Sequence, residues 1–125
     1  MYTSPRLVWT AWWIVAIGAL HTLFGLLEYS SGWTAIANAG FWDAVEGEPP
    51  REHAFWFTLF GPFLVLLGAL MRWIVHQPRL RLPAFLGWGL LLFAAVAALL
   101  IPVSGFWLFV PPGLAITRSK PALQD

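Results

Sequence analysis

Four long apolar stretches, separated by short polar segments, dominate the pattern of residues along this chain. They cover about residues 6–28, 53–73, 84–101 and 103–117. A helix that rises about 1.5 Å per residue needs about 20 apolar residues to cross the hydrocarbon core of a bilayer. The pattern therefore predicts an all-α polytopic membrane protein, with one domain over residues 1–125 that forms a four-transmembrane-helix bundle.

The segment between the first two apolar stretches is less hydrophobic and has a different pattern. Its apolar side chains fall near one helical face, whereas its polar and acidic side chains lie elsewhere. Residues 33–46 are therefore predicted to form a short extracytoplasmic interfacial helix between spans one and two. Gly47-Glu48-Pro49-Pro50 is expected to end it, and Pro50 suits the first turn of the next helix, where no backbone donor is needed.

The fourth apolar stretch is short and contains Pro111 and Pro112. Residues 84–116 are too many for one span and barely enough for two, so residues 102–105 are interpreted as a tight turn between two short spans. The prolines remove two backbone donors, which frees carbonyl groups near Trp107 and Leu108 that must find other partners. A simple helix stop and a broken helix that lines a binding site both remain open.

Basic residues set the expected orientation in the membrane. With four spans, only Arg51 falls on one side, and all the other basic residues fall on the opposite side: Arg6, Arg72, Arg79, Arg81, Arg118 and Lys120. Because Lys and Arg concentrate in cytoplasmic loops, this asymmetry predicts that both termini are cytoplasmic.

Composition narrows the function classes. The chain is 59% hydrophobic and 10% charged, outside the range of soluble globular proteins. A net charge of +1 and the lack of a basic patch argue against nucleic-acid binding. The chain has no cysteine, which excludes disulfides and thiolate metal sites. Sequence signatures of enzymes are also absent, so an enzyme is not favoured.

Two glycine-containing stripes carry the candidate chemistry. In the first span, Gly18, His21, Gly25 and Glu28 recur at spacings of three and four, which places them on one helical face. In the second span the same spacing connects a longer set: His53, Phe57, Gly61, Leu64, Gly68 and Arg72. Since polar residues and glycines in membrane helices usually face other helices, the two stripes are predicted to face each other.

His21 lies about 10 Å deeper than Glu28 and His53 when helical rise is counted from the outer ends of the spans. The predicted ligand-binding set is therefore His21, Glu28, His53, Gly18, Gly25 and Gly61, with Glu52 near the outer mouth. The other interpretation is structural: His21 donates one hydrogen bond across the helices while Glu28 and His53 reach water. No spacing in this set is typical of a metal site, and no catalytic residue is indicated.

The favoured function is non-enzymatic binding of a small apolar or lipid-like ligand, or of a partner membrane protein, near His21 and Glu28. A proton-linked small transporter is the first alternative. A haem-binding electron carrier is the second, although His21 and His53 lie at different levels for two axial ligands. The expected partners are the lipid bilayer and another membrane protein or a second copy of the chain, and the sequence identifies no cofactor.

Several short motifs resemble those of known proteins. With Gly18-Ala19-Leu20-His21, Phe24-Gly25, Phe55-Trp56-Phe57, Phe60-Gly61 and Leu66-Leu67-Gly68, the first two spans resemble small four-helix bacterial inner-membrane proteins grouped as families of unknown function. The resemblance implies a four-helix fold in the bacterial inner membrane, with the region around His21 as a signature. It implies no activity.

Overall fold

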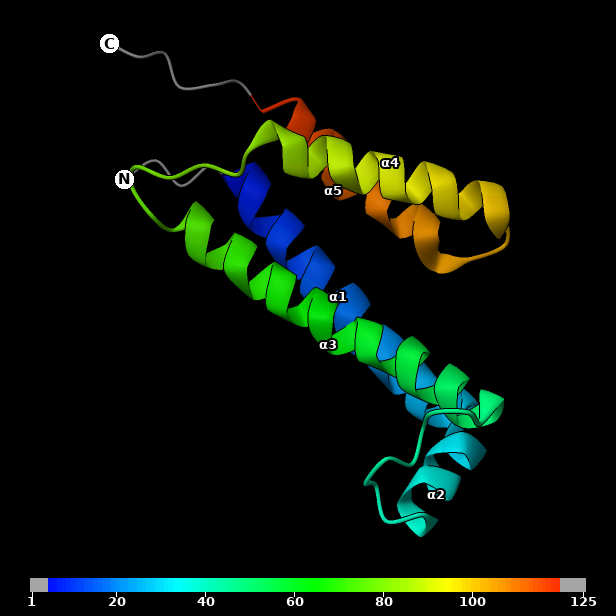
Figure 1. Ribbon diagram of the computed structural model, residues 1–125. Helices are drawn as coiled ribbons and strands as arrows, with labels where there is room; N and C mark the ends of the chain where they lie inside the picture. The colour runs from blue at the N-terminus through cyan, green and yellow to red at the C-terminus, as the bar shows by residue number, and fades with distance from the viewer. Residues whose placement is uncertain (1–4, 120–125) are drawn as a thin grey trace. The chain divides into compact units, whose positions relative to one another are not determined.

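The fold is all-α over the part of the chain that the structure, a computed structural model, describes: residues 5–119, with side chains from residue 7. These residues form five α-helices and one short 3₁₀ helix, and Figure 1 labels the α-helices. Their bounds are α1 Pro5–Glu28, α2 Ser30–Asn38, α3 Pro49–Val75, α4 Ala84–Leu100, η1 Gly105–Phe109 and α5 Val110–Thr117. The all-α prediction is confirmed. Lys120, one of the basic residues used to predict orientation, lies outside the described residues.

The chain divides into two compact units, each described here by itself. One unit is Val15–Leu67, and the other combines Met1–Ile14 with Gly68–Asp125. Within Val15–Leu67, α1 and α3 run side by side (Figure 1). Their backbones approach so closely that a Cβ atom added at Gly18 would lie 2.6 Å from the carbonyl oxygen of Gly61. The two predicted stripes do face each other there.

The interfacial helix was predicted too long. It ends at Asn38, and residues 39–48 form turns. Gly40 causes the stop, because it adopts a positive φ of 82° that continues no right-handed helix. Its N–H donates to the carbonyl of Ala37, and the N–H of Phe41 donates to the carbonyl of Ile36, which is the Schellman pattern of a helix end.

In the other unit, α4 packs against η1 and α5 (Figure 1). Gly87 and Gly113 permit this close contact, since a Cβ at Gly87 would lie 2.9 Å from the carbonyl oxygen of Gly113. The chain reverses through residues 101–104, as the predicted turn requires. Pro111 and Pro112 lie in the first turn of α5, where a helix needs no backbone donors.

Only α1 and α3 are both long and apolar enough to cross a membrane, by length and composition, among the helices of residues 5–119. The qualifying segments are Leu7–Glu28 and Pro49–Val75, with 22 and 27 residues. α4 has 17 residues, and the apolar segment Gly105–Thr117 is shorter still. The structure thus contains two helices of spanning length, and it does not show four spans.

Candidate functional site

His21 lies on α1 and reaches the backbone of α3 with its imidazole ring. Its Nε2 is 2.9 Å from the carbonyl oxygen of Phe57. Because a carbonyl oxygen only accepts, Nε2 carries the hydrogen and donates. The ring stacks on Phe57, with a centroid distance of 4.0 Å, and meets the ring of Phe60 edge-on at 5.3 Å. His21 is therefore held in place by one hydrogen bond and two aromatic contacts.

The carbonyl that His21 contacts lies next to the carbonyl of α3 that Pro62 leaves without a backbone donor. Pro62 is inside the helix and has no N–H, so the carbonyl of Thr58 lacks its usual helical donor. Thr58 itself is buried, and its hydroxyl accepts a hydrogen bond from Nε1 of Trp33 on α2 at 3.0 Å. His21 and Trp33 thus attach α1 and α2 to the same turn of α3.

Gly18, Gly25 and Gly61, the three glycines of the predicted set, contact the opposing helix directly and form a seam between α1 and α3. A Cβ at Gly25 would lie 2.6 Å from the Thr58 hydroxyl, and one at Gly61 would meet the hydroxyl of Thr22. That hydroxyl donates to the carbonyl of Gly18 at 2.8 Å. Along this seam, helix backbone and Thr22 fill the space that the glycines leave.

Glu28 and His53 are both exposed, and no contact of either with His21 is recorded among the described residues. Glu52 is engaged elsewhere, because its Oε1 accepts a hydrogen bond from the backbone N–H of Gly47 at 2.9 Å. Within residues 5–119, no group of three or more His, Cys, Asp or Glu side chains is placed to hold a metal ion. The structure therefore brings His21 and the glycines together, and among the described residues it shows no contact between His21 and either Glu28 or His53.

The imidazole of His21 keeps one unused hydrogen-bonding atom. With Nε2 donating to Phe57, the neutral ring presents Nδ1 as an acceptor, and no partner for it is recorded among residues 5–119. The side chain is partly exposed. An acceptor beside the rings of Phe57 and Phe60 suits a donor group on an otherwise apolar molecule.

Comparison with protein families gives a match over most of the chain. The model described as "Family of unknown function (DUF6463)" covers residues 6–122. The chain belongs to this family. No curated protein and no solved structure matches the DUF6463 chain. The expected membership of an uncharacterised family is thereby confirmed, and the family description adds no activity to the site.

Sequence reasoning missed two features of the DUF6463 site. The first is the aromatic surroundings of His21, to which Phe57 and Phe60 contribute from α3. Phe57 belongs to the predicted stripe of the second span, which faces the stripe that contains His21, so the contact between the two side chains could have been predicted. The second is Pro62. A proline inside an apolar helix has no N–H, so it indicates that the carbonyl four residues earlier, that of Thr58, has no helical donor.

Proposed function

We propose that this DUF6463 protein is a non-enzymatic, multi-pass protein of the bacterial inner membrane that binds a small apolar or lipid-like ligand beside His21. The proposed spans are 6–28, 53–73, 84–101 and 103–117, with both termini in the cytoplasm. Two observations support a membrane location. The first is that the most hydrophobic windows of α1 and α3 are only 28% and 33% buried, whereas the core helix of a soluble protein is mostly buried. The second is the exposure of apolar side chains elsewhere in the chain.

Large apolar side chains on other helices are exposed as well. In α4, Leu99 is 80% exposed and Leu92 is 67% exposed, and Val103 in the following turn is 96% exposed. Water would make such exposed apolar surface unfavourable, and lipid chains would not. The exposed surfaces of α4 and the turn therefore support placing these segments in the membrane too.

The observation that carries the binding proposal is the free Nδ1 acceptor of His21. A hydroxyl or amine group on an apolar ligand would donate to Nδ1 while the ligand body lies against Phe57 and Phe60. A ligand that could not donate would leave this nitrogen without a partner in lipid, which is costly for a polar atom. The ligand class that fits is thus an apolar molecule with one donor group.

The experiment compares ligands that remain bound after gentle extraction from membranes, measured by mass spectrometry. The informative variant is His21→Gln, since glutamine can still donate to the Phe57 carbonyl through its side-chain amide but lacks an acceptor at the Nδ1 position. One hydrogen bond is worth about 0.5–1.5 kcal/mol, so the affinity for the ligand should fall by roughly two- to tenfold and its occupancy should fall with it. His76→Gln, which changes an exposed histidine of the other unit, is the matched control.

The expected result is one apolar, donor-bearing species in the wild-type protein and in His76→Gln, with reduced occupancy in His21→Gln. The thermal stability of His21→Gln should fall only slightly, because glutamine keeps the hydrogen bond to Phe57 and loses the ring contacts with Phe57 and Phe60. A wild-type protein without any such species would refute the binding proposal. Equal occupancy in His21→Gln and wild type would remove His21 from the site.

A further inference from the structure

An open surface cavity, away from His21, lies entirely within Val15–Leu67. Its volume is about 440 Å³, in the range of small-molecule sites. The loop after α2 and the first turns of α3 line it together. Glu52, Phe55 and Trp56 project from one face of α3, because their spacing of three and four places them on successive turns.

The polar lining of this cavity is acidic. Three of the lining residues carry carboxylates: Asp43, Glu46 and Glu52. No cationic side chain is recorded within ion-pair distance of them among residues 5–119. Arg51, the nearest cation along the chain, donates through Nη1 to the carbonyl of Ala44 at 3.0 Å. Because Ala44 also lines the cavity, one positive charge at Arg51 stands beside three carboxylates, which leaves a net negative charge at the cavity.

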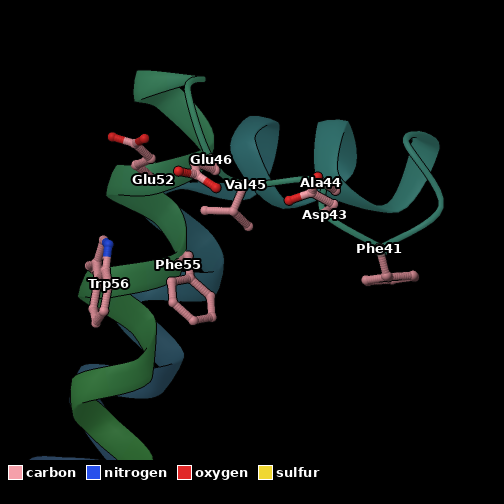
Figure 2. A pocket seen from close by; sticks show the side chains of 8 residues that line it. All are labelled: Phe41, Asp43, Ala44, Val45, Glu46, Glu52, Phe55 and Trp56. Carbon is pink, nitrogen blue, oxygen red and sulfur yellow. The ribbon is translucent and has the colours of Figure 1, made fainter.

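The other walls are aromatic. Phe41, Phe55 and Trp56 line the cavity, and the rings of Phe55 and Trp56 meet edge-on with centroids 5.1 Å apart. In Figure 2 both rings lie below the carboxylates of Glu46 and Glu52. Aromatic faces attract weakly hydrated cations, and sites that combine them with negative charge are typical of ammonium recognition.

A metal ion fits this lining less well. Metal binding needs several ligands that converge on one point, and no such group of acidic or histidine side chains occurs in residues 5–119. An organic cation needs no such convergence, because its charge is spread over a larger apolar surface. The volume, the negative charge and the aromatic rings together therefore favour an organic cation over a metal ion.

We propose that the cavity between residues 41–46 and the start of α3 binds an organic ammonium ion of the choline or ethanolamine type. The carboxylates supply the opposite charge, and the rings of Phe55 and Trp56 contact the apolar groups attached to nitrogen. This site is independent of the proposed ligand at His21. The ammonium group can belong to a free amine or to the headgroup of a phospholipid.

The first test measures binding of choline to the purified full chain by calorimetry. Its neutral isostere, in which carbon replaces the charged nitrogen, serves as the control ligand. Glu46→Gln and Glu52→Gln remove charge while keeping side-chain shape, and the glutamine at 52 can still accept from Gly47. Glu48→Gln makes the same charge change at an exposed acid of the same loop that does not line the cavity.

The site predicts saturable choline binding that the isostere does not reproduce. Glu46→Gln and Glu52→Gln should each weaken binding by about tenfold, the effect of roughly 1.4 kcal/mol, and Trp56→Leu should weaken it at unchanged stability. The second test places the protein in nanodiscs of phosphatidylglycerol with or without phosphatidylethanolamine.

Selective retention of phosphatidylethanolamine that Glu52→Gln abolishes would identify a lipid headgroup as the source of the ammonium group, and choline binding alone would identify a free amine. Absence of binding in both tests would overturn the proposal. Equal binding of the neutral isostere, or equal losses in Glu48→Gln and Glu52→Gln, would overturn it as well. None of these outcomes depends on a ligand at His21.

Discussion

At the start of α5, a tryptophan replaces the backbone donor that two prolines remove. Nε1 of Trp13 donates to the carbonyl of Leu108 at 2.8 Å. That carbonyl would receive the N–H of residue 111 in a 3₁₀ helix or of residue 112 in an α-helix, and both are proline. The neighbouring carbonyl of Trp107 accepts from the N–H of Val110. The carbonyl groups of Trp107 and Leu108, which the sequence predicts to lose their backbone donors, therefore both accept a hydrogen bond.

Because Trp13 supplies the donor that Pro112 lacks, substitutions at these two residues should have coupled effects on stability. Trp13→Phe should lower the free energy of unfolding by about 0.5–1.5 kcal/mol, because the Leu108 carbonyl loses its donor. Pro112→Ala restores a backbone N–H at the α-helical donor position for Leu108. In that background, the additional effect of Trp13→Phe should be smaller by about 1 kcal/mol.

The four proteins of this double-mutant cycle are compared by thermal unfolding in detergent. Trp88→Phe, at an exposed position of α4, should have the same small effect in both backgrounds and serves as the control. Strictly additive effects of Trp13→Phe and Pro112→Ala would show that the hydrogen bond does not substitute for the missing donor.

At the scale of elements, glycine determines how closely the helices approach. Gly18 on α1 and Gly61 on α3 each lie against the other's carbonyl oxygen, with 2.6 and 2.7 Å between that oxygen and an added Cβ. Gly89 on α4 is different, since nothing lies within 4 Å of its Cβ position. The same residue type therefore has a packing role at Gly18 and Gly61, and no such role at Gly89.

Alanine substitutions at these glycines should have opposite effects. Gly18→Ala and Gly61→Ala should each destabilise the protein by about 1–3 kcal/mol, since the helix backbones must move apart. Gly89→Ala should be neutral or should stabilise α4 by up to about 1 kcal/mol, because alanine has the higher helix propensity. Thermal unfolding of the three variants measures the difference. Similar melting temperatures for Gly18→Ala and Gly89→Ala would contradict a tight seam.

The sequence predicts the helices and the seam because both depend on local periodicity. Spacings of three and four place Gly18 and Gly61 on facing stripes, and long apolar runs locate α1, α3 and α4. Periodicity alone could not show that α2 ends at Asn38, because the end is set by the positive φ of Gly40. It also could not place Glu52, whose carboxylate accepts from Gly47 in a turn with no repeating pattern.

At the scale of the whole molecule, the number of spans decides where the turn at residues 101–104 lies. If only α1 and α3 cross the membrane, this turn stays on the same side as both termini. If α4 and the segment 105–117 also cross, the turn moves to the opposite side while the C-terminal end returns. A reporter at the C-terminus reads the same in both cases, so the turn is the position that discriminates between them.

The absence of cysteine allows a direct test with single cysteine variants and a membrane-impermeant maleimide. Four spans with cytoplasmic termini predict that Glu48→Cys and Val103→Cys react in intact cells, whereas Arg79→Cys reacts only after permeabilisation. All three positions are exposed, so burial within the chain does not explain a missing signal. Labelling of Glu48→Cys without labelling of Val103→Cys would reduce the protein to two spans, because the turn would then be cytoplasmic. Labelling of Arg79→Cys in intact cells, with Glu48→Cys protected, would reverse the orientation that the basic residues predict.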